Sequence, residues 1–354
     1  MKEERTYYVG IDLHKQYCTV TVLDEAGNEL DQRNIPNDAE DFTIYFKQWE
    51  GKIKAALEAT YNWYGLVDLL QRLGVEMKLA HPYKTRIIGE AKVKTDKIDS
   101  RILAQLLRAD FLPTSFIADP KTRDDREWLR HRIYLVRIQT SIKMRIHCLI
   151  DKYNIRHDFS DLFGKEGIEF LKSLKLPERT QRSLEGLLRV LEFLREELRP
   201  IRNEIIASAK EEEAARLLES LPGFGYFSAL LFLKEIGTIE RFPSAKKLAA
   251  YSGLVPGISS SGGKTQTRGI TKQGNKYLRW ILIQAASSVV RTKKDRRLMG
   301  LYSRIQHRKN SKIAKVAVAK ELVTIAYFIL KHREPYDPMR LYLQNNRRAI
   351  LNRV

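Results

Sequence analysis

The chain has 354 residues, a formal net charge of +20 at pH 7 and an apolar content of 43%. This length accommodates two or three domains, and this apolar content is enough for packed cores, which excludes a disordered chain. The basic balance, with a pI near 9.8, favours a polyanionic partner, with nucleic acid ahead of an anionic membrane surface.

Cysteine usage and hydropathy exclude further classes of protein. Cys18 and Cys148 are the only cysteines, too few for a disulfide framework or a zinc site. The N-terminal sequence MKEERTYYVG lacks the apolar core of a signal peptide, and no apolar run reaches the ~18 residues of a membrane span. We therefore expect a cytoplasmic protein with no membrane association.

Residues 5–110 are typical of an α/β domain. An antiparallel meander is predicted first, with strands at residues 7–12, 19–23 and 29–35. Strand–helix alternation follows, with strands at 53–58 and 75–79 and helices at 39–49, 61–73 and 96–108. This order of elements indicates a ribonuclease H-like fold.

Four carboxylates lie at informative places in this pattern. Asp12 and Glu58 each end an apolar strand, while Asp96 and Asp99 lie three residues apart and can face inward from one helical turn. Converging carboxylates repel one another unless a cation lies between them, and their oxygens suit hard divalent ions. The pattern predicts a Mg²⁺ site, with two ions, of the kind that supports phosphodiester chemistry. The alternative, the phosphate loop of an actin-like ATPase, is disfavoured because His14 replaces the glycine of that loop.

Residues 116–215 are predicted to be helical. An apolar stripe steps by three and four over three heptads. It consists of Leu184, Leu187, Leu191, Leu194, Leu198, Ile201 and Ile205. Pro200 interrupts the stripe and predicts a kink or a break. The stripe suits either a helical hairpin within the chain or a coiled coil between subunits, and the sequence leaves both open.

The C-terminal part begins with a predicted helix, tight turn and helix over residues 217–236. The turn resembles the hairpin of a helix-hairpin-helix module, whose backbone amides approach a DNA phosphate, although a plain turn between core helices is the alternative. A flexible Gly/Ser-rich loop is expected at 257–269, followed by basic amphipathic helices at 275–290 and 311–330.

Positive charge is concentrated in this part of the chain. Residues 241–320 hold 19 Lys or Arg and one acid, Asp295. The clustering favours a nucleic-acid-binding surface over a basic surface kept for solubility. The residues expected to contact nucleic acid are Gly223, Gly225, Lys264, Arg268, Lys272, Lys276 and Arg279.

The Gly/Ser-rich loop carries three consecutive serines, Ser259, Ser260 and Ser261. The neighbouring Gly-Lys-Thr is not a P-loop, because Ile258 occupies a position where that motif requires glycine. A serine oxygen could attack phosphorus and form a covalent link to DNA. Composition alone favours a solvated linker instead.

Five motifs in order resemble those of one family. They are Gly-Ile-Asp-x-x-Lys, Glu-Ala-Thr, Lys-Thr-Asp-x-x-Asp, Leu-Pro-Gly-x-Gly and Leu-x-Pro-x-x-x-x-Ser-Gly. Over residues 6–335 the chain closely resembles the Asp-Glu-Asp-Asp (DEDD) insertion-sequence transposases, relatives of the Piv DNA invertase. Members join a RuvC-like domain to a C-terminal transposase domain that carries a characteristic serine.

The resemblance implies roles for individual residues. The four carboxylates match the metal-binding tetrad of the family, Lys15 matches the first motif, and Ser261, five residues after Pro256, matches the nucleophile. It implies a recombinase in which Mg²⁺ helps to activate Ser261 and a covalent phosphoserine–DNA intermediate forms. It also implies double-stranded donor and target DNA, a structured non-coding bridge RNA, and a dimer or tetramer in which the acids of one subunit meet the serine of another.

The resulting domain prediction has four segments. They are a catalytic domain at 1–115, a helical oligomerisation segment at 116–215, a transposase domain at 216–335 and a tail at 336–354. Other functions remain open beside the RNA-guided recombinase. A RuvC-like structure-selective endonuclease would use metal-activated water, a protein-only DNA invertase would need no RNA, and a non-enzymatic binding protein would carry a decayed site.

Overall fold

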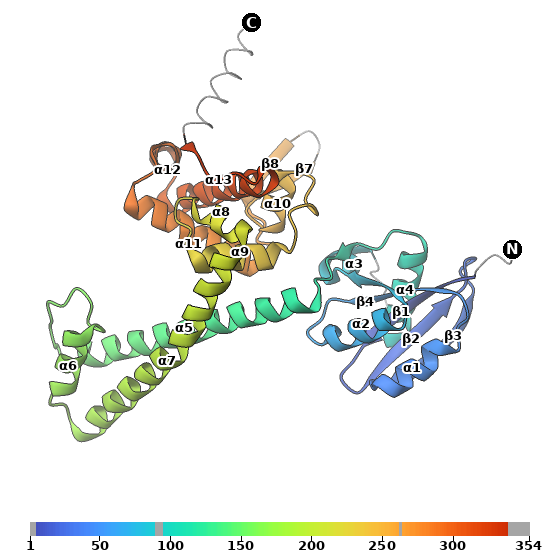
Figure 1. Ribbon diagram of the computed structural model, residues 1–354, viewed down its shortest axis with the longest axis horizontal. Coiled ribbons are helices and arrows are strands. Elements are labelled where there is room, and N and C mark those ends of the chain that lie inside the picture. The colour runs from blue at the N-terminus through green and yellow to red at the C-terminus, as the bar shows by residue number, and fades with distance from the viewer. Residues whose placement is uncertain (1–4, 89–94, 262–263, 339–354) are drawn as a thin grey trace, which may run out of the picture. The chain divides into compact units, whose positions relative to one another are not determined.

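The computed structural model describes residues 5–88, 95–261 and 264–338, without the side chains of residues 258–268. The chain divides into two compact units, Met1–Ala118 and Asp119–Val354 (Figure 1). Each unit contains its own cluster of buried apolar side chains. Within these residues, no helix has the length and apolar character that crossing a membrane requires.

The described part of the N-terminal unit is built on a mixed sheet with the strand order β3-β2-β1-β4-β5-β6. Its strands are β1 (Thr6–Leu13), β2 (Tyr17–Leu23), β3 (Glu29–Pro36), β4 (Lys52–Glu58), β5 (Glu76–Ala80) and β6 (Thr114–Ser115). The first three strands form an antiparallel meander, and β1, β4 and β5 are parallel. This topology confirms the predicted ribonuclease H-like fold.

Alternation along β1 gives each face of the sheet its own helical layer. The odd-numbered residues from Tyr7 to Leu13 are buried with apolar side chains of α1 (Ala39–Lys47) and α2 (Trp63–Arg72). The even-numbered residues face α4 (Asp96–Arg108), which packs on the other side. A short helix, α3 (Pro82–Ile88), follows β5.

The close packing of α4 on the sheet depends on Gly10. A Cβ atom at this position would lie 1.9 Å from the carbonyl oxygen of Ser100, so any larger residue would displace the helix. The hydroxyls of Ser100 and Thr21 lie 2.8 Å apart in the buried contact. Gln32 donates to the carbonyl oxygen of Lys97 at 3.1 Å. These contacts hold the first turn of α4 beside the carboxyl end of β1.

The described part of the C-terminal unit is mostly helical, as predicted. The long helices α5 (Pro120–Asp151) and α7 (Glu178–Glu211) pack against each other, with α6 (Lys165–Ser173) between them in sequence. The remaining helices are α8 (Glu213–Glu219), α9 (Tyr226–Ile236), α10 (Ala245–Tyr251), α11 (Lys276–Thr292), α12 (Arg296–Arg308) and α13 (Ser311–His332).

The apolar stripe of α7 is buried within the chain. Leu184 and Leu191 pack with the last turns of α5, while Ile201 and Ile205 pack with its N-terminal half. This arrangement is an antiparallel hairpin, and it favours the first of the two predicted alternatives. The helix continues through Pro200. A break at this residue, one of the two predicted effects, is therefore wrong, because buried contacts on both sides hold the helix together.

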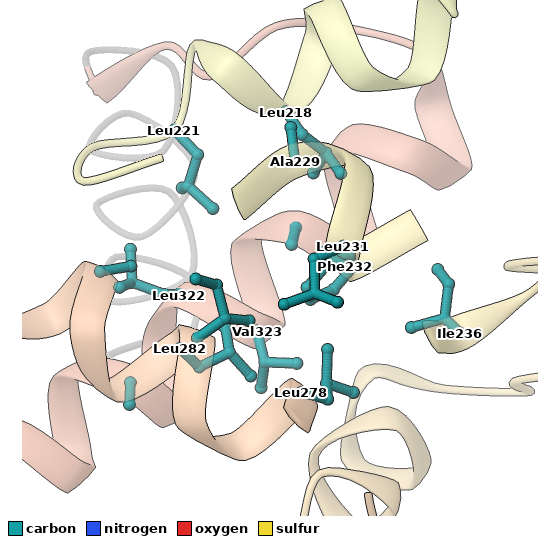
Figure 2. Packing of buried hydrophobic residues seen from close by; sticks show 14 of the residues in the cluster. Leu218, Leu221, Ala229, Leu231, Phe232, Ile236, Leu278, Leu282, Leu322 and Val323 are labelled. Carbon is teal, nitrogen blue, oxygen red and sulfur yellow. The ribbon is translucent and has the colours of Figure 1, made fainter. Parts of the chain in front are cut away.

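The core of the C-terminal unit surrounds α9. Residues 229–233 of this helix are all buried, as expected for a helix that is apolar on every side. Phe232 belongs to the same buried cluster as Leu282 of α11 and Val323 of α13 (Figure 2). The second helix of the helix–turn–helix, α9, therefore fixes this motif in the core of the C-terminal unit.

The Gly/Ser-rich segment is a strand pair and not the predicted flexible loop. β7 (Pro256–Ser261) pairs antiparallel with β8 (Lys264–Ile270), and Ser261 lies opposite Lys264 in the register. Glycine and serine have low strand propensity, so composition favoured a loop. Backbone hydrogen bonding nevertheless forms the ladder.

Candidate metal centre

The carboxyl ends of β1 and β4 meet at one edge of the sheet. Ile11 of β1 is paired with Leu57 of the parallel β4, and both side chains are fully buried on the α1–α2 face. Because side chains alternate along a strand, the next residues, Asp12 and Glu58, project from the opposite face, which α4 covers. The two predicted acids therefore end neighbouring strands on the same face.

The first turn of α4 adds two acids to this edge. The side chain of Thr95 accepts a hydrogen bond from the backbone N–H of Ile98 at 3.3 Å and thereby caps the helix, which begins at Asp96. Because α4 lies directly on Gly10, two residues before Asp12, this turn is held beside Asp12.

The side chains that meet most closely are Asp12, His14 and Asp96. Nε2 of His14 lies 3.2 Å from a carboxylate oxygen of Asp12 and 3.2 Å from a carboxylate oxygen of Asp96. Tyr17 donates its hydroxyl to the same Asp96 oxygen at 3.0 Å, and its ring lies 4.9 Å from that of His14. One ligand atom from each of the first three residues lies within 4.8 Å of the others, a spacing that can hold a metal ion.

Burial and neighbouring charges both act on the acids at this edge. Burial raises the pKa of Asp12, and the charges of Asp96 and Asp99 raise it further, while His14 acts in the opposite direction. The hydrogen bond to Asp96 likewise raises the pKa of Tyr17. A cation would relieve the repulsion among the acids.

The structure therefore brings part of the predicted tetrad into a close group. Asp12 and Asp96 belong to it, and Asp99 is near enough for its charge to act on Asp12. Glu58 ends the adjacent strand but is not in the three-residue group found among the described residues. No role for His14 is predicted from the sequence, because a single histidine after a strand has no diagnostic spacing.

Comparisons with known proteins agree with this arrangement. A model of the DEDD transposase of IS110 matches residues 9–155, and a model described as the transposase IS116/IS110/IS902 family matches residues 215–302. The chain belongs to the IS110 family of transposases. It is thus an enzyme that transesterifies DNA, and the resemblance inferred from its motifs is confirmed.

Similar proteins support the same assignment. The transposase for insertion sequence element IS1111A from Coxiella burnetii is 25% identical, over 93% of this chain and 90% of its own length. The transposase for element IS1328 from Yersinia enterocolitica is 26% identical, over 91% and 96%. The pilin gene-inverting protein of Moraxella bovis is 31% identical over 35% of this chain and 38% of its own length, which shows a distant relation to the Piv invertase.

The predicted nucleophile of this transposase lies in the C-terminal unit. Ser261 is the last residue of β7, and Ser259 and Ser260 precede it on the same strand. The side chains of all three lie outside the described part of the structure. The choice of Ser261 therefore still rests on the motif that follows Pro256.

Two of the predicted nucleic-acid contacts lie in the turn between α8 and α9. Gly223 has φ +84°, and a Cβ atom there would lie 2.4 Å from the carbonyl oxygen of Ala285, so packing against α11 requires glycine. A Cβ atom at Gly225, before α9, would meet nothing within 4 Å. The glycine requirement at Gly223 thus has a structural cause, and its contact with DNA stays a prediction.

The other predicted contacts surround the β7–β8 hairpin. Arg279 donates to the carbonyl oxygens of Lys272 at 2.9 Å and Ser252 at 3.4 Å, so it already supports the hairpin base. Lys276 lies over the ring of Tyr277 at 5.1 Å. The side chain of Lys272 is exposed, and those of Lys264 and Arg268 lie outside the described residues. The roles of these five basic residues in DNA binding stay predictions.

Proposed function

We propose that this transposase cuts and rejoins DNA at a Mg²⁺ centre formed by Asp12, Glu58, Asp96 and Asp99, with Ser261 as the nucleophile. The observation that carries the proposal is the approach of Asp96 to Asp12. Asp12, at the end of a strand, and Asp96, at the start of a helix, are distant in sequence. Both carboxylates nevertheless contact the imidazole of His14. Partly buried acids that lie this close together are more typical of a functional site than of a purely structural contact.

The donor set suits a divalent ion. Asp12 and Asp96 would supply carboxylate oxygens, with Asp99 and Glu58 available from the same helix turn and the adjacent strand. Oxygen donors favour Mg²⁺, and the imidazole of His14 is also accepted by Mn²⁺. A bound ion would stabilise charge that develops on the phosphate and favour ionisation of the attacking hydroxyl.

The proposed covalent step exchanges one phosphodiester for another. Oγ of Ser261 attacks phosphorus, and the bond from phosphorus to the 3′ oxygen breaks. The serine loses its proton and the 3′ oxygen gains one, which leaves the 5′ phosphate on the serine. A 3′ hydroxyl of a new strand then attacks the same phosphorus and releases the serine. Strands are exchanged without hydrolysis.

The proposed partners are donor and target DNA, a bridge RNA, and further copies of the chain. Nineteen basic residues and one acid at 241–320 support a polyanionic partner. The names of the relatives refer to insertion sequence elements and to inversion of a pilin gene, which supports DNA as the substrate. The RNA and the assembly rest on the family resemblance alone.

Single substitutions test the chemistry. The substrate is a supercoiled plasmid that carries the coding sequence of the chain with its flanking DNA. Asp12→Asn and Ser261→Ala should each lower the protease-sensitive protein–DNA adduct by ~10³-fold or more. Ser260→Ala is the matched control and should retain the adduct. Cleavage that persists in Ser261→Ala would instead identify water as the attacking group.

The RNA has a separate test. The chain is expressed together with its flanking DNA, purified, and its bound nucleic acid is sequenced. A structured RNA whose loops pair with two DNA sites is the expected result. Recombination by an RNA-free preparation would contradict guidance and support the protein-only invertase.

A further inference from the structure

An ionic cluster around a fully buried carboxylate lies in the C-terminal unit, outside the residues assigned to the chemistry. Glu235, near the end of α9, has no exposed side-chain surface. Its two carboxylate oxygens accept hydrogen bonds from Nε and Nη2 of Arg130, each at 2.9 Å. Nδ2 of Asn275 donates to the same carboxylate at 2.6 Å. The charge is thus paired and hydrogen-bonded from two directions.

The cluster is joined to both ends of the β7–β8 hairpin. Asn275, which follows the second strand, donates its backbone N–H to the carbonyl oxygen of Tyr251 at 2.8 Å. Tyr251, which precedes the first strand, donates its hydroxyl to the carbonyl oxygen of Glu235 at 3.3 Å. Between them, the N–H of Thr271 donates to the carbonyl oxygen of Val255 at 3.0 Å. Hydrogen bonds therefore join the two ends of the hairpin to each other and to the helical core.

The same cluster ties the hairpin base to α5. Nη2 of Arg126 donates to the carbonyl oxygen of Glu235 at 3.3 Å, and its Nε donates to the carbonyl oxygen of Lys234 at 2.5 Å. The guanidinium of Arg130 also lies 4.7 Å from the ring centre of Tyr277, in the first turn of α11. Contacts from α5, α11 and the hairpin base thus converge on one residue of α9, Glu235, through its carboxylate and its backbone carbonyl.

A contribution to folding stability does not by itself explain why this cluster is present. A buried ion pair contributes little net stability, because desolvation offsets the attraction between the charges. Its geometry is demanding, however. The rigid fork of Arg130 and the short amide of Asn275 satisfy Glu235 in only a narrow range of helix positions. A cluster of this kind fixes orientation.

We infer that Glu235 is a positioning residue which, with Arg130 and Asn275, fixes the hairpin that presents Ser261. The inference rests on the proposed serine chemistry. Displacement of a nucleophile by ~1 Å can slow a reaction ~10²-fold without changing substrate binding. Loosening the cluster should therefore slow the covalent step and leave DNA affinity unchanged.

Asn275 offers the sharpest variants. Its Oδ1 caps α11 by accepting from the N–H groups of Tyr277 and Leu278, both at 2.9 Å. Serine and aspartate both keep a capping oxygen. Asn275→Ser removes the donor to Glu235, and Asn275→Asp places a second carboxylate against it. The matched control is Glu321→Gln, which removes an ion pair with Arg297 between α12 and α13.

Two readouts on the full chain test the inference. Hydrogen exchange of the β7 and β8 amides should be ~10-fold faster in Asn275→Asp than in the wild type. The rate in Asn275→Ser should lie between these two rates. The α13 amides should keep their wild-type protection in both variants. The plasmid adduct should fall ~10- to 100-fold, with unchanged affinity for a short fluorescent duplex. Glu321→Gln should leave the hairpin and the adduct unchanged.

Hairpin exchange that stays at the wild-type rate in both Asn275 variants would overturn the inference. Equal acceleration throughout the C-terminal unit would also overturn it, because that marks general loss of stability. The serine proposal fails separately, if Ser261→Ala forms as much adduct as the wild type. Hairpin exchange does not depend on that chemistry and still decides the role of Glu235.

Discussion

The acidic centre depends on a residue that has no side chain. Gly10 lies on the same face of β1 as Asp12 and lets the backbone of α4 approach the strand. Without this approach, Asp96 would not reach the imidazole of His14. The carboxylates would provide the proposed chemistry, but the steric space at Gly10 determines how close Asp96 lies to Asp12.

Gly10→Ala should therefore destabilise the N-terminal unit. The new Cβ would lie 1.9 Å from the carbonyl oxygen of Ser100, which is backbone and cannot rotate away. Overpacking of this kind costs ~1–3 kcal/mol or more, measurable by urea unfolding. Gly65→Ala in α2 is the control, because a Cβ there meets nothing within 4 Å, and it should shift stability by less than ~1 kcal/mol. Equal stability of the two variants would contradict this packing.

The two thiols should differ sharply in reactivity. Burial raises the pKa of Cys18 to about 12, whereas Cys148 is exposed. At about pH 8 a thiol reagent should label Cys148 in the native protein and Cys18 only after unfolding. Because folding raises the Cys18 pKa above its usual 9.0, the unfolded state ionises first, and stability should fall as pH rises from about 9 towards 12. Native labelling that persists in Cys148→Ser would show that Cys18 is accessible.

At the scale of elements, strong local signals were predictable and weak ones were not. α4 has the predicted bounds because Thr95 caps it and its apolar residues recur with helical spacing. β7 and β8 were missed because glycine and serine carry no strand signal. α12 was missed because its many charges obscure the apolar side that buries Leu298 and Tyr302. The position of His14 depends on tertiary contacts, which no local pattern encodes.

Pro200 allows the contribution of buried packing to the stability of α7 to be tested. It is exposed within α7, where it removes one backbone hydrogen bond while the buried stripe continues on both sides. Pro200→Ala should restore that bond and raise the unfolding free energy by ~1–3 kcal/mol. Glu197→Ala, on the exposed surface of the same helix, should change it by less than ~0.5 kcal/mol. A loss of stability in Pro200→Ala would show that the packing of α7 requires the proline.

At the scale of the whole molecule, the proposed chemistry is divided between two units. The acidic centre lies within residues 1–118, and the serine hairpin lies within residues 119–354. Neither part can perform the proposed step alone. The family resemblance implies that an active site combines the acids of one subunit with the serine of another, and in that case assembly would be a condition for catalysis.

Shared active sites predict complementation between inactive variants. Asp12→Asn supplies an intact serine, and Ser261→Ala supplies intact acids. In a mixed assembly, some sites then combine both intact parts. An equal mixture should form substantial adduct with the plasmid, while each variant alone forms ~10³-fold less than the wild type. The adduct should be carried only by the Asp12→Asn subunit, which a size tag on that subunit reveals by gel mobility. A mixture as inactive as its components would mean that acids and serine act within one subunit.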